Sequence, residues 1–167
     1  MNVAFRVVLK DVDESYPNGL NPLDVALYIA EKKARAFDET LEEGDIVLTA
    51  DTVVVIDNII LGKPADREDA VEMLKMLSGR KHEVITGVAI LTRQGLRSLA
   101  DTTEVCFKDL SDEQIGYYID TCKPFDKAGA YGIQEWIGMI GLERISGSYT
   151  NVVGLPTQKV YEELMKL

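Results

Sequence analysis

The apolar run from Ile46 to Pro64 constrains the fold of this chain more than any other feature, because it contains an acidic side chain. Residues 46–56 are almost all β-branched or aliphatic, and Asp51 lies in their middle. A strand this apolar is normally buried on both faces. Because burial of an unpaired carboxylate is costly, Asp51 must lie at a strand end that faces solvent, or be held by cations, a metal ion or hydrogen-bond donors.

The same run ends in a positive charge. Asp57 and Asn58 predict a turn, and residues 59–61 predict a short returning strand. Lys63 follows directly, so it is expected at the end of a strand that pairs with the strand of Asp51. The two residues are either a polar cluster with a chemical role or a turn-capping carboxylate and a surface lysine, and this segment alone leaves both interpretations open.

Composition indicates a globular chain. Its 167 residues suffice for a single domain, 1–167, with a real core. Hydrophobic residues make up 46% and charged residues 28%, which argues against disorder. No window of about 18 apolar residues predicts a membrane helix, and the charged N-terminal stretch is not typical of a signal peptide. The two cysteines lack metal or redox spacing, which indicates a cytoplasmic protein with reduced thiols.

Charge and histidine content narrow the function further. The formal net charge of −10 argues against nucleic acid as a partner. A single histidine, His82, argues against a histidine-based metal site and a Ser-His-Asp triad, and it is expected to make a local hydrogen bond. A small anionic substrate remains compatible with this chain if a few lysines or a divalent metal offset the carboxylates.

The remaining pattern alternates strands and helices. Strands are predicted at 3–9, 46–56, 59–61, 82–92 and 96–107, and helices at 22–37, 66–77, 111–119 and 157–166. Residues 126–141 are predicted to be a loop with one short helix, and residues 151–156 a turn. This alternation predicts an α/β (α+β) fold with a mixed, twisted β-sheet flanked by helices.

Three carboxylates are expected to converge: Asp13, Glu14 and Asp51. Oxygen ligands of this kind suit Mg²⁺ or Mn²⁺, commonly as one or two carboxylates together with substrate phosphates. The alternative is that Asp11, Asp13 and Glu14 form a solvated acidic loop.

Two lysines and two loops complete the candidate site. Lys33 and Lys63 suit phosphate binding, although most lysines are simply solvated. Residues 127–134 combine glycines with Gln134, which could contact a base edge or orient a water, or the segment could be a tight structural loop. Residues 146–156 could present hydroxyls or amides to phosphate, or be a turn.

Five blocks along the chain resemble one family. They are Ala50-Asp-Thr-Val-Val-Val55, Leu61-Gly-Lys-Pro64, Leu77-Ser-Gly-Arg-Lys-His-Glu-Val-Ile-Thr-Gly-Val88, Asp126-Lys-Ala-Gly-Ala-Tyr-Gly-Ile-Gln134 and Gly147-Ser-Tyr-Thr-Asn-Val-Val-Gly-Leu-Pro156. In this order they resemble the signature blocks of the Maf-like nucleoside triphosphate pyrophosphatases, over essentially the whole chain. The fourth block resembles the branch that acts on dTTP and UTP rather than the branch that acts on 7-methyl-GTP.

The resemblance implies a Maf/ITPase-like fold and hydrolysis of a nucleoside triphosphate to the monophosphate and pyrophosphate, with a divalent metal cofactor (Mg²⁺ or Mn²⁺). It implies that Asp51 accepts a proton and, with Glu14, lies at the metal. It also links Thr52 and Gln134 to base selection, and it places Lys33 and Lys63 at the triphosphate. Members of the family often pair, so a homodimer is a further expectation, although no apolar stripe in the sequence marks an interface.

One family block has no counterpart in this sequence. Family members begin with a strand, a Ser-x-Ser-Pro-Arg-Arg loop and a helix, whereas this chain starts at what resembles their second strand, Phe5–Leu9. We therefore expect a sheet without that first strand and helix, with exposed backbone edges. Because the loop would supply arginines to the triphosphate, weak or absent activity is expected.

Two other functions stay open on the sequence. The absent arginine loop motivates a non-catalytic nucleotide-binding or cell-division regulatory protein. A phosphatase with Asp51 as its nucleophile is less favoured, because the second aspartate expected at position 53 is a valine.

Overall fold

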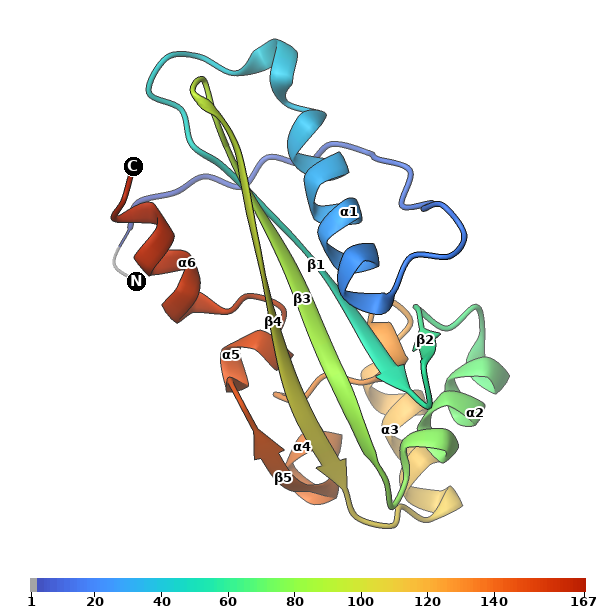
Figure 1. The fold of residues 1–167 in the computed structure, drawn as a ribbon. Helices are drawn as coiled ribbons and strands as arrows, with labels where there is room; N and C mark the ends of the chain where they lie inside the picture. Colours follow the sequence, from blue (N-terminus) through green and yellow to red (C-terminus); the bar gives the residue numbers. More distant parts are fainter. Residues whose placement is uncertain (1–2) are drawn as a thin grey trace.

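The computed structural model describes residues 3–167 (Figure 1). In chain order the elements are α1 (Pro22–Arg35), the 3₁₀ turn η1 (Asp38–Thr40), β1 (Val47–Ile56), β2 (Ile59–Leu61), α2 (Arg67–Leu77), β3 (Lys81–Thr92), β4 (Gly95–Phe107), α3 (Asp112–Cys122), the 3₁₀ turn η2 (Ala128–Ala130), α4 (Trp136–Gly141), β5 (Leu142–Ser146), α5 (Tyr149–Val152) and α6 (Thr157–Leu164).

The strands form one sheet in the order β2-β1-β3-β4-β5, and every pairing is antiparallel. The predicted α+β class with a sheet flanked by helices is confirmed, but within residues 3–167 the sheet is antiparallel where a mixed sheet was expected. Tight turns join β1 to β2 and β3 to β4, which requires two of the four pairings to be antiparallel. Asp57 and Asn58 adopt positive φ angles of 51° and 62°, as a two-residue hairpin turn requires.

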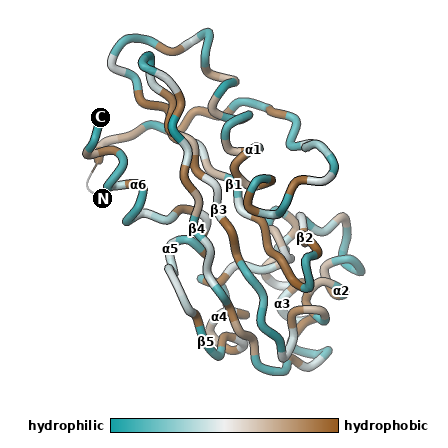
Figure 2. The backbone as a smooth tube through the Cα atoms, viewed as in Figure 1, coloured by the Kyte–Doolittle hydropathy of each residue, from teal (hydrophilic) through white to brown (hydrophobic). Residues whose placement is uncertain are grey.

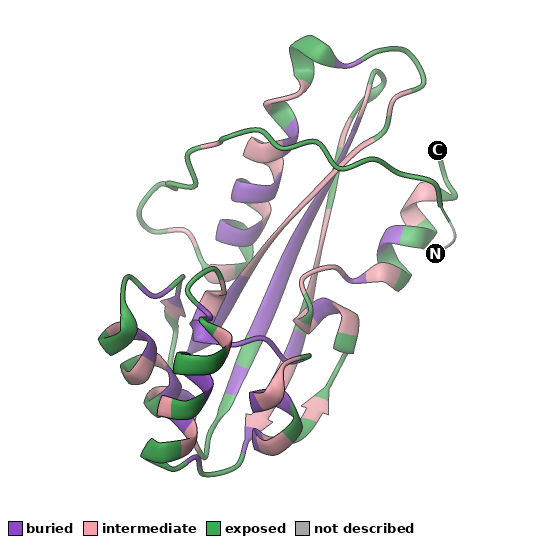
Figure 3. Ribbon diagram, turned by 180° about the vertical axis from the view of Figure 1, so that it is seen from behind, coloured by how far each residue is buried: buried purple, intermediate pink, exposed green. Residues whose placement is uncertain are grey.

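Both faces of the central strands are covered, which explains their continuous apolar sequence (Figure 2). Odd-numbered positions of β1 and β3 face α1, where Val53, Val55 and Ile85 pack on Val25 and Ile29. Even-numbered positions face the other helices. There one cluster joins β1 and β3 to α2 and α3, and another joins them to α6. Figure 3 shows β3 buried along most of its length, whereas β1 is half-buried over residues 47–52 and buried from Val53 to Ile56.

Helix α1 approaches the sheet unusually closely at Gly87. Asn21 caps the helix through the backbone N–H of Asp24, and Pro22 occupies its first turn. A Cβ atom at Gly87 would lie 2.4 Å from the carbonyl carbon of Ala26, so only glycine permits this contact. The Thr49 hydroxyl donates to the Ala30 carbonyl at 2.7 Å and fixes the helix along β1.

The predicted strand at residues 3–9 is wrong. This segment is extended but forms no β-bridge with any described residue, and Phe5, Val7 and Leu9 are 85%, 76% and 90% exposed. An apolar alternating sequence becomes a strand only with a backbone partner, which this segment lacks among residues 3–167. The Lys10 ammonium instead donates to the Ala36 carbonyl at 2.7 Å, where α1 ends.

The other predicted elements are confirmed to within a few residues, including the capping box of Ser111 and Gln114 that opens α3. Strand β5 and helix α5 were missed. Both are short, and α5 occupies part of the segment predicted as a turn because the Ser148 hydroxyl accepts from the Asn151 N–H and caps it.

Gly87→Ala is expected to destabilise the protein because the new methyl group must displace the backbone of α1. Overpacking of this kind costs about 1–3 kcal/mol, and more where backbone has to move. Urea unfolding measures the change. Gly62→Ala is the matched control, since nothing lies within 4 Å of its new Cβ atom; equal stability of the two variants would contradict the close packing of α1.

Candidate active site

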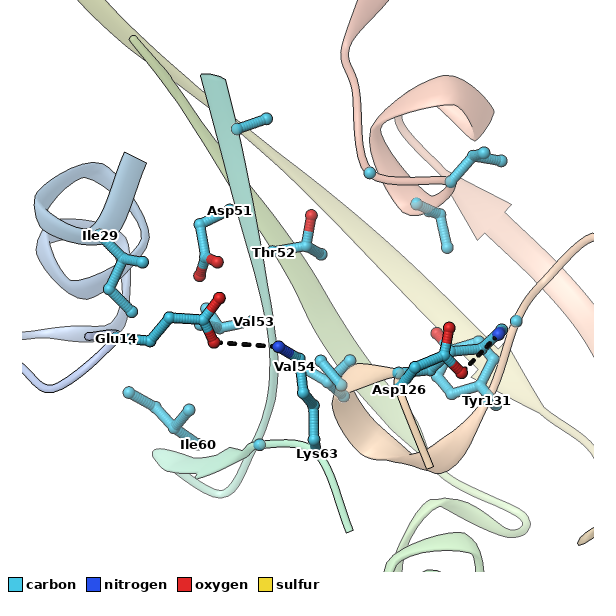
Figure 4. A pocket seen from close by; sticks show the side chains of 18 of the residues that line it. Glu14, Ile29, Asp51, Thr52, Val53, Val54, Ile60, Lys63, Asp126 and Tyr131 are labelled. Carbon is cyan, nitrogen blue, oxygen red and sulfur yellow. Dashed lines mark hydrogen bonds and ion pairs between the residues drawn. The ribbon is translucent and has the colours of Figure 1, made fainter. Parts of the chain in front are cut away.

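A cavity of about 650 Å³ opens at the outer edge of β1 (Figure 4). Strand β2 pairs only with Val54–Ile56 of β1, so in the part of the chain described here residues 47–53 have no strand on that side. The cavity is lined from β1, from α1 and the segment before it, and from three loops: residues 62–63, 126–134 and 152–154. A ligand in this cavity would therefore lie along an unpaired strand edge.

Alternating charges run through the cavity. The Lys33 ammonium lies 2.7 Å from Asp51 Oδ1 and 2.8 Å from Glu14 Oε1, and the Lys63 ammonium lies 2.9 Å from Glu14 Oε2. Asp51 is the most enclosed member, with a side chain only 14% exposed. Asp51 therefore lies in mid-strand, opposite Gly87, and is held by a cation rather than turned to solvent.

The two carboxylates have opposite pKa shifts. Burial raises the pKa of Asp51 above its ordinary value of 3.8, and this effect outweighs the lowering by Lys33. Hydrogen bonds from Lys33 and Lys63 lower the pKa of Glu14. Burial lowers the pKa of the Lys33 ammonium, but its bonds to Asp51 and Glu14 raise it by more, so Lys33 stays charged. Asp51 is thus a more basic carboxylate than an ordinary aspartate, and Glu14 a less basic one than an ordinary glutamate.

The carboxylates expected to converge do so only in part. Glu14 and Asp51 both contact Lys33, but Asp13 does not reach them. Its side chain accepts from the Ser15 hydroxyl and lies 3.0 Å from the Lys32 ammonium, 70% exposed. Asp13 is thus held at the surface by a neighbouring serine and a lysine of α1, so for Asp13 the solvated-loop alternative holds.

Thr52 and Asp51 point to opposite sides of β1, as adjacent strand residues must (Figure 4). Thr52 lines the cavity on the side of α5, together with Val153 and Gly154. Gln134 also lines the cavity and is exposed there. The candidate residues Glu14, Lys33, Asp51, Thr52, Lys63 and Gln134 therefore all border one cavity.

Lys127 and Asp126 line the cavity as well, and they were missed as site residues. The Lys127 ammonium lies 2.9 Å from Asp126 and 3.3 Å from Glu135. Glu135 also accepts from the Tyr118 hydroxyl, which in turn accepts from the Gly132 N–H at 3.0 Å. These contacts hold the loop that carries Gln134. The sequence could have indicated Lys127, because it lies within the glycine-containing segment 127–134, already identified from the sequence as a candidate loop.

Other candidates have structural roles. His82 Nε2 shares a hydrogen bond of 2.8 Å with the Tyr131 hydroxyl, and burial lowers the pKa of His82 to about 4, so it is neutral, as expected of a packed histidine. The hydroxyls of Ser148 and Thr150 bond to each other. Val53 faces α1 in the core, so no second carboxylate lies beside Asp51 on the strand.

The charges around the cavity balance. Three carboxylates (Glu14, Asp51 and Asp126) meet three lysines (Lys33, Lys63 and Lys127). A polyphosphate would add several negative charges, which the lysines alone cannot offset while they are paired. Glu14 and Asp51 both contact the Lys33 ammonium, and residues 3–167 contain no group of three or more His, Cys, Asp or Glu side chains placed to hold a metal ion. A divalent cation at this point would therefore rest on these two carboxylates together with substrate phosphates, a common way of holding Mg²⁺.

The structure thus combines an α+β fold with a lysine-lined cavity around one buried carboxylate of raised pKa, an arrangement typical of functional sites. The sequence model described as "Maf-like protein" matches residues 1–167, and the chain belongs to this family. None of the helices in residues 3–167 is long and apolar enough to span a membrane.

Relatives that are about 50% identical to this chain are named dTTP/UTP pyrophosphatase. The dTTP/UTP pyrophosphatase of Flavobacterium johnsoniae is 51% identical over 167 residues, which is all of this chain and 86% of the relative. That of Phocaeicola vulgatus is 52% identical over 168 residues (100% and 87%). That of Parabacteroides distasonis is 49% identical over 165 residues (98% and 86%).

Asp51→Asn is expected to raise the free energy of unfolding at neutral pH. The folded-state pKa of Asp51 is raised, so above it the ionised carboxylate is less favourable in the folded than in the unfolded state. Urea unfolding at about pH 7 and pH 3 tests this, and the gain should shrink at the lower pH, where the carboxyl is protonated.

Asp120→Asn is the matched control, and it is expected to lower the free energy of unfolding at neutral pH rather than raise it. The Arg67 hydrogen bond lowers the pKa of Asp120, so its contribution is present above the unfolded-state pKa and is lost as the pH falls through the folded-state value. A loss of stability at neutral pH in Asp51→Asn would contradict the raised pKa of Asp51.

Proposed function

We propose that this chain hydrolyses dTTP and UTP to the nucleoside monophosphate and pyrophosphate. The observation that carries the proposal is Asp51, a buried carboxylate of raised pKa held by Lys33 inside a lysine-lined cavity. The names of the relatives at about 50% identity support the choice of nucleotide.

In the proposed reaction, water attacks a phosphorus atom of the bond between the α- and β-phosphates. Asp51 accepts the proton of the water, the phosphorus–oxygen bond breaks, and the electron pair leaves with the departing phosphate oxygen. A base close to the attacked phosphate contributes about 10²–10⁴-fold to such a step. The raised pKa of Asp51 makes it a better proton acceptor than an ordinary aspartate.

The lysines bind and stabilise the phosphates. Lys33 lies beside the base, Lys63 beside Glu14, and Lys127 on the opposite wall with Asp126. Phosphate oxygens can replace the carboxylates as partners of these ammonium groups, so charge that develops on the leaving pyrophosphate meets fixed cations. The cavity of about 650 Å³ leaves room for the chain of phosphates between them.

Glu14 and Asp51 would hold a divalent cation, Mg²⁺ or Mn²⁺. When bound, such a cation neutralises phosphate charge and lowers the pKa of a coordinated water. Binding has to separate the carboxylates from the Lys33 ammonium, and the Lys33 side chain, which is one quarter exposed, would have to turn towards solvent or towards a phosphate.

The direct test is release of pyrophosphate from dTTP and UTP with Mg²⁺ or Mn²⁺. Asp51→Asn should lower kcat by about 10²–10⁴-fold while the protein stays folded, and the surface variant Asp120→Asn should retain wild-type turnover. Activity unaffected by Asp51→Asn would contradict the role of Asp51. Calorimetric binding of dTTP or UTP without any turnover would instead support a non-catalytic nucleotide-binding protein.

Lys33→Met is expected to shift the acidic limb of the pH profile of kcat/KM to higher pH. The limb reports the pKa of the base in the free enzyme. Burial and Glu14 raise the pKa of Asp51, while Lys33 and, by a smaller amount, Lys63 lower it, so removal of the Lys33 ammonium takes away the larger lowering effect and raises the pKa. A limb that stays in place or moves to lower pH would show that another group is the base.

A further inference from the structure

A buried polar chain connects the cavity to α5 through the sheet. Thr52 and Thr86 are cross-strand neighbours in the register of β1 and β3, and their Oγ1 atoms lie 2.9 Å apart. Thr86 Oγ1 also lies 3.0 Å from the backbone carbonyl oxygen of Asn151. Thr86 and Asn151 are completely buried, so neither group can exchange these partners for water.

The position of Asn151 is fixed independently. Its side-chain Nδ2 donates to the Val84 carbonyl and to Thr103 Oγ1, both at 2.9 Å. Its backbone carbonyl accepts from the Gly154 N–H at 2.9 Å as well as from Thr86. Rotation of the Asn151 carbonyl away from Thr86 would therefore break bonds on both sides of the residue.

This arrangement fixes the direction of each hydrogen bond. A carbonyl oxygen can only accept, so the single hydroxyl hydrogen of Thr86 points to Asn151. The short contact between Thr86 and Thr52 must then be bridged by the hydrogen of Thr52. Thr52 donates its only hydroxyl hydrogen to Thr86, so the Thr52 oxygen presents only lone pairs to the cavity that it lines. Towards a ligand, Thr52 is an acceptor only.

We propose that Thr86 is a specificity-determining positioning residue, which makes Thr52 an obligate acceptor for the N3–H group of uracil or thymine. This inference rests on the proposed function, because it assumes a pyrimidine nucleotide in the cavity. Uracil and thymine carry an N–H at N3, between two carbonyls. Cytosine has an unprotonated N3, whose lone pair would face the lone pairs of Thr52. Sites built to hydrogen-bond one group reject an analogue that lacks it, because buried polar groups are left unpaired.

The open space beside Thr52 supports a base at this position. Gly154 lines the cavity with φ of 109°, and a Cβ atom there would lie 3.5 Å from Thr52 Oγ1. Glycine therefore leaves the Thr52 oxygen free to meet a ligand. Gln134, on the same cavity, has an amide that can donate to a neighbouring base carbonyl.

The test compares kcat/KM for UTP and CTP in wild type and Thr86→Val. The valine keeps the shape of threonine but removes the acceptor of the Thr52 hydrogen, so the Thr52 hydroxyl becomes free to donate to cytosine N3. The UTP-over-CTP preference should fall by about tenfold, equivalent to about 1.4 kcal/mol. Thr86→Ser restores the hydroxyl and should restore the preference, which loss of packing alone would not predict. Thr102→Val, an exposed threonine of β4, is the matched control.

A preference unchanged in Thr86→Val, or lowered equally in Thr86→Ser, would overturn the inference. If Thr86→Val does not fold, Thr86→Ala removes the same hydroxyl without adding a methyl group, and the same ratio decides. Triphosphates of 3-methyluridine identify the base atom: turnover equal to that of UTP would overturn the role of N3–H. If wild type hydrolyses neither UTP nor dTTP, the proposed function fails, and calorimetric binding of UTP and CTP to the same variants still measures the preference.

Discussion

The contact between Lys33 and Asp51 depends on how closely helix α1 approaches the sheet. Ala26 rests on Gly87, directly across the strand pair from Asp51. Two helical turns further along the same face, Lys33 reaches Asp51 at 2.7 Å. A larger side chain at position 87 would move the helix away and leave a carboxylate in the apolar strand without its cation. The packing of α1 on the sheet at Gly87 therefore determines whether the buried carboxylate of Asp51 has a cation beside it.

Two adjacent residues of strand β1, Asp51 and Thr52, face two different parts of the cavity. Asp51 faces α1 and its lysine, while Thr52 faces α5 and the buried chain through Thr86 to Asn151. Although neighbouring side chains on a strand point to opposite faces, Asp51 and Thr52 both line the same cavity, so a ligand in it meets both. In the proposed function, this geometry would separate the chemistry at the phosphates from recognition at the base, so substitutions at Thr86 and at Lys33 are expected to alter different properties.

Local signals in the sequence predicted most of the fold. Periodicity, caps and turns located α1, the β1–β2 hairpin and the capping box of Ser111 correctly, because these depend on neighbours in the chain. The strand at residues 3–9 was wrong because pairing depends on distant backbone. Strand β5 and helix α5 were missed because four or five residues carry too little pattern.

The same distinction holds for the site. Asp51 was identified as a misfit within its own strand, and the blocks around Lys63 and Gln134 brought in the rest. Residue pattern alone could not decide between Asp13 and Glu14, since a loop has no periodicity to show which side chain turns inward; only the family resemblance singled out Glu14. It could not show Thr86 at all as a site residue, because its role appears only when β1, β3 and α5 are assembled.

The most direct measurement is an NMR titration of the carboxyl groups of Asp51 and Glu14 in the free protein. If α1 encloses Asp51 with Lys33 as described, Asp51 titrates above 3.8 while Glu14 titrates below 4.5, with the two inflections shifted in opposite directions. An Asp51 that titrates at or below its ordinary value would contradict its burial, and with it the account of Asp51 as the base of this site.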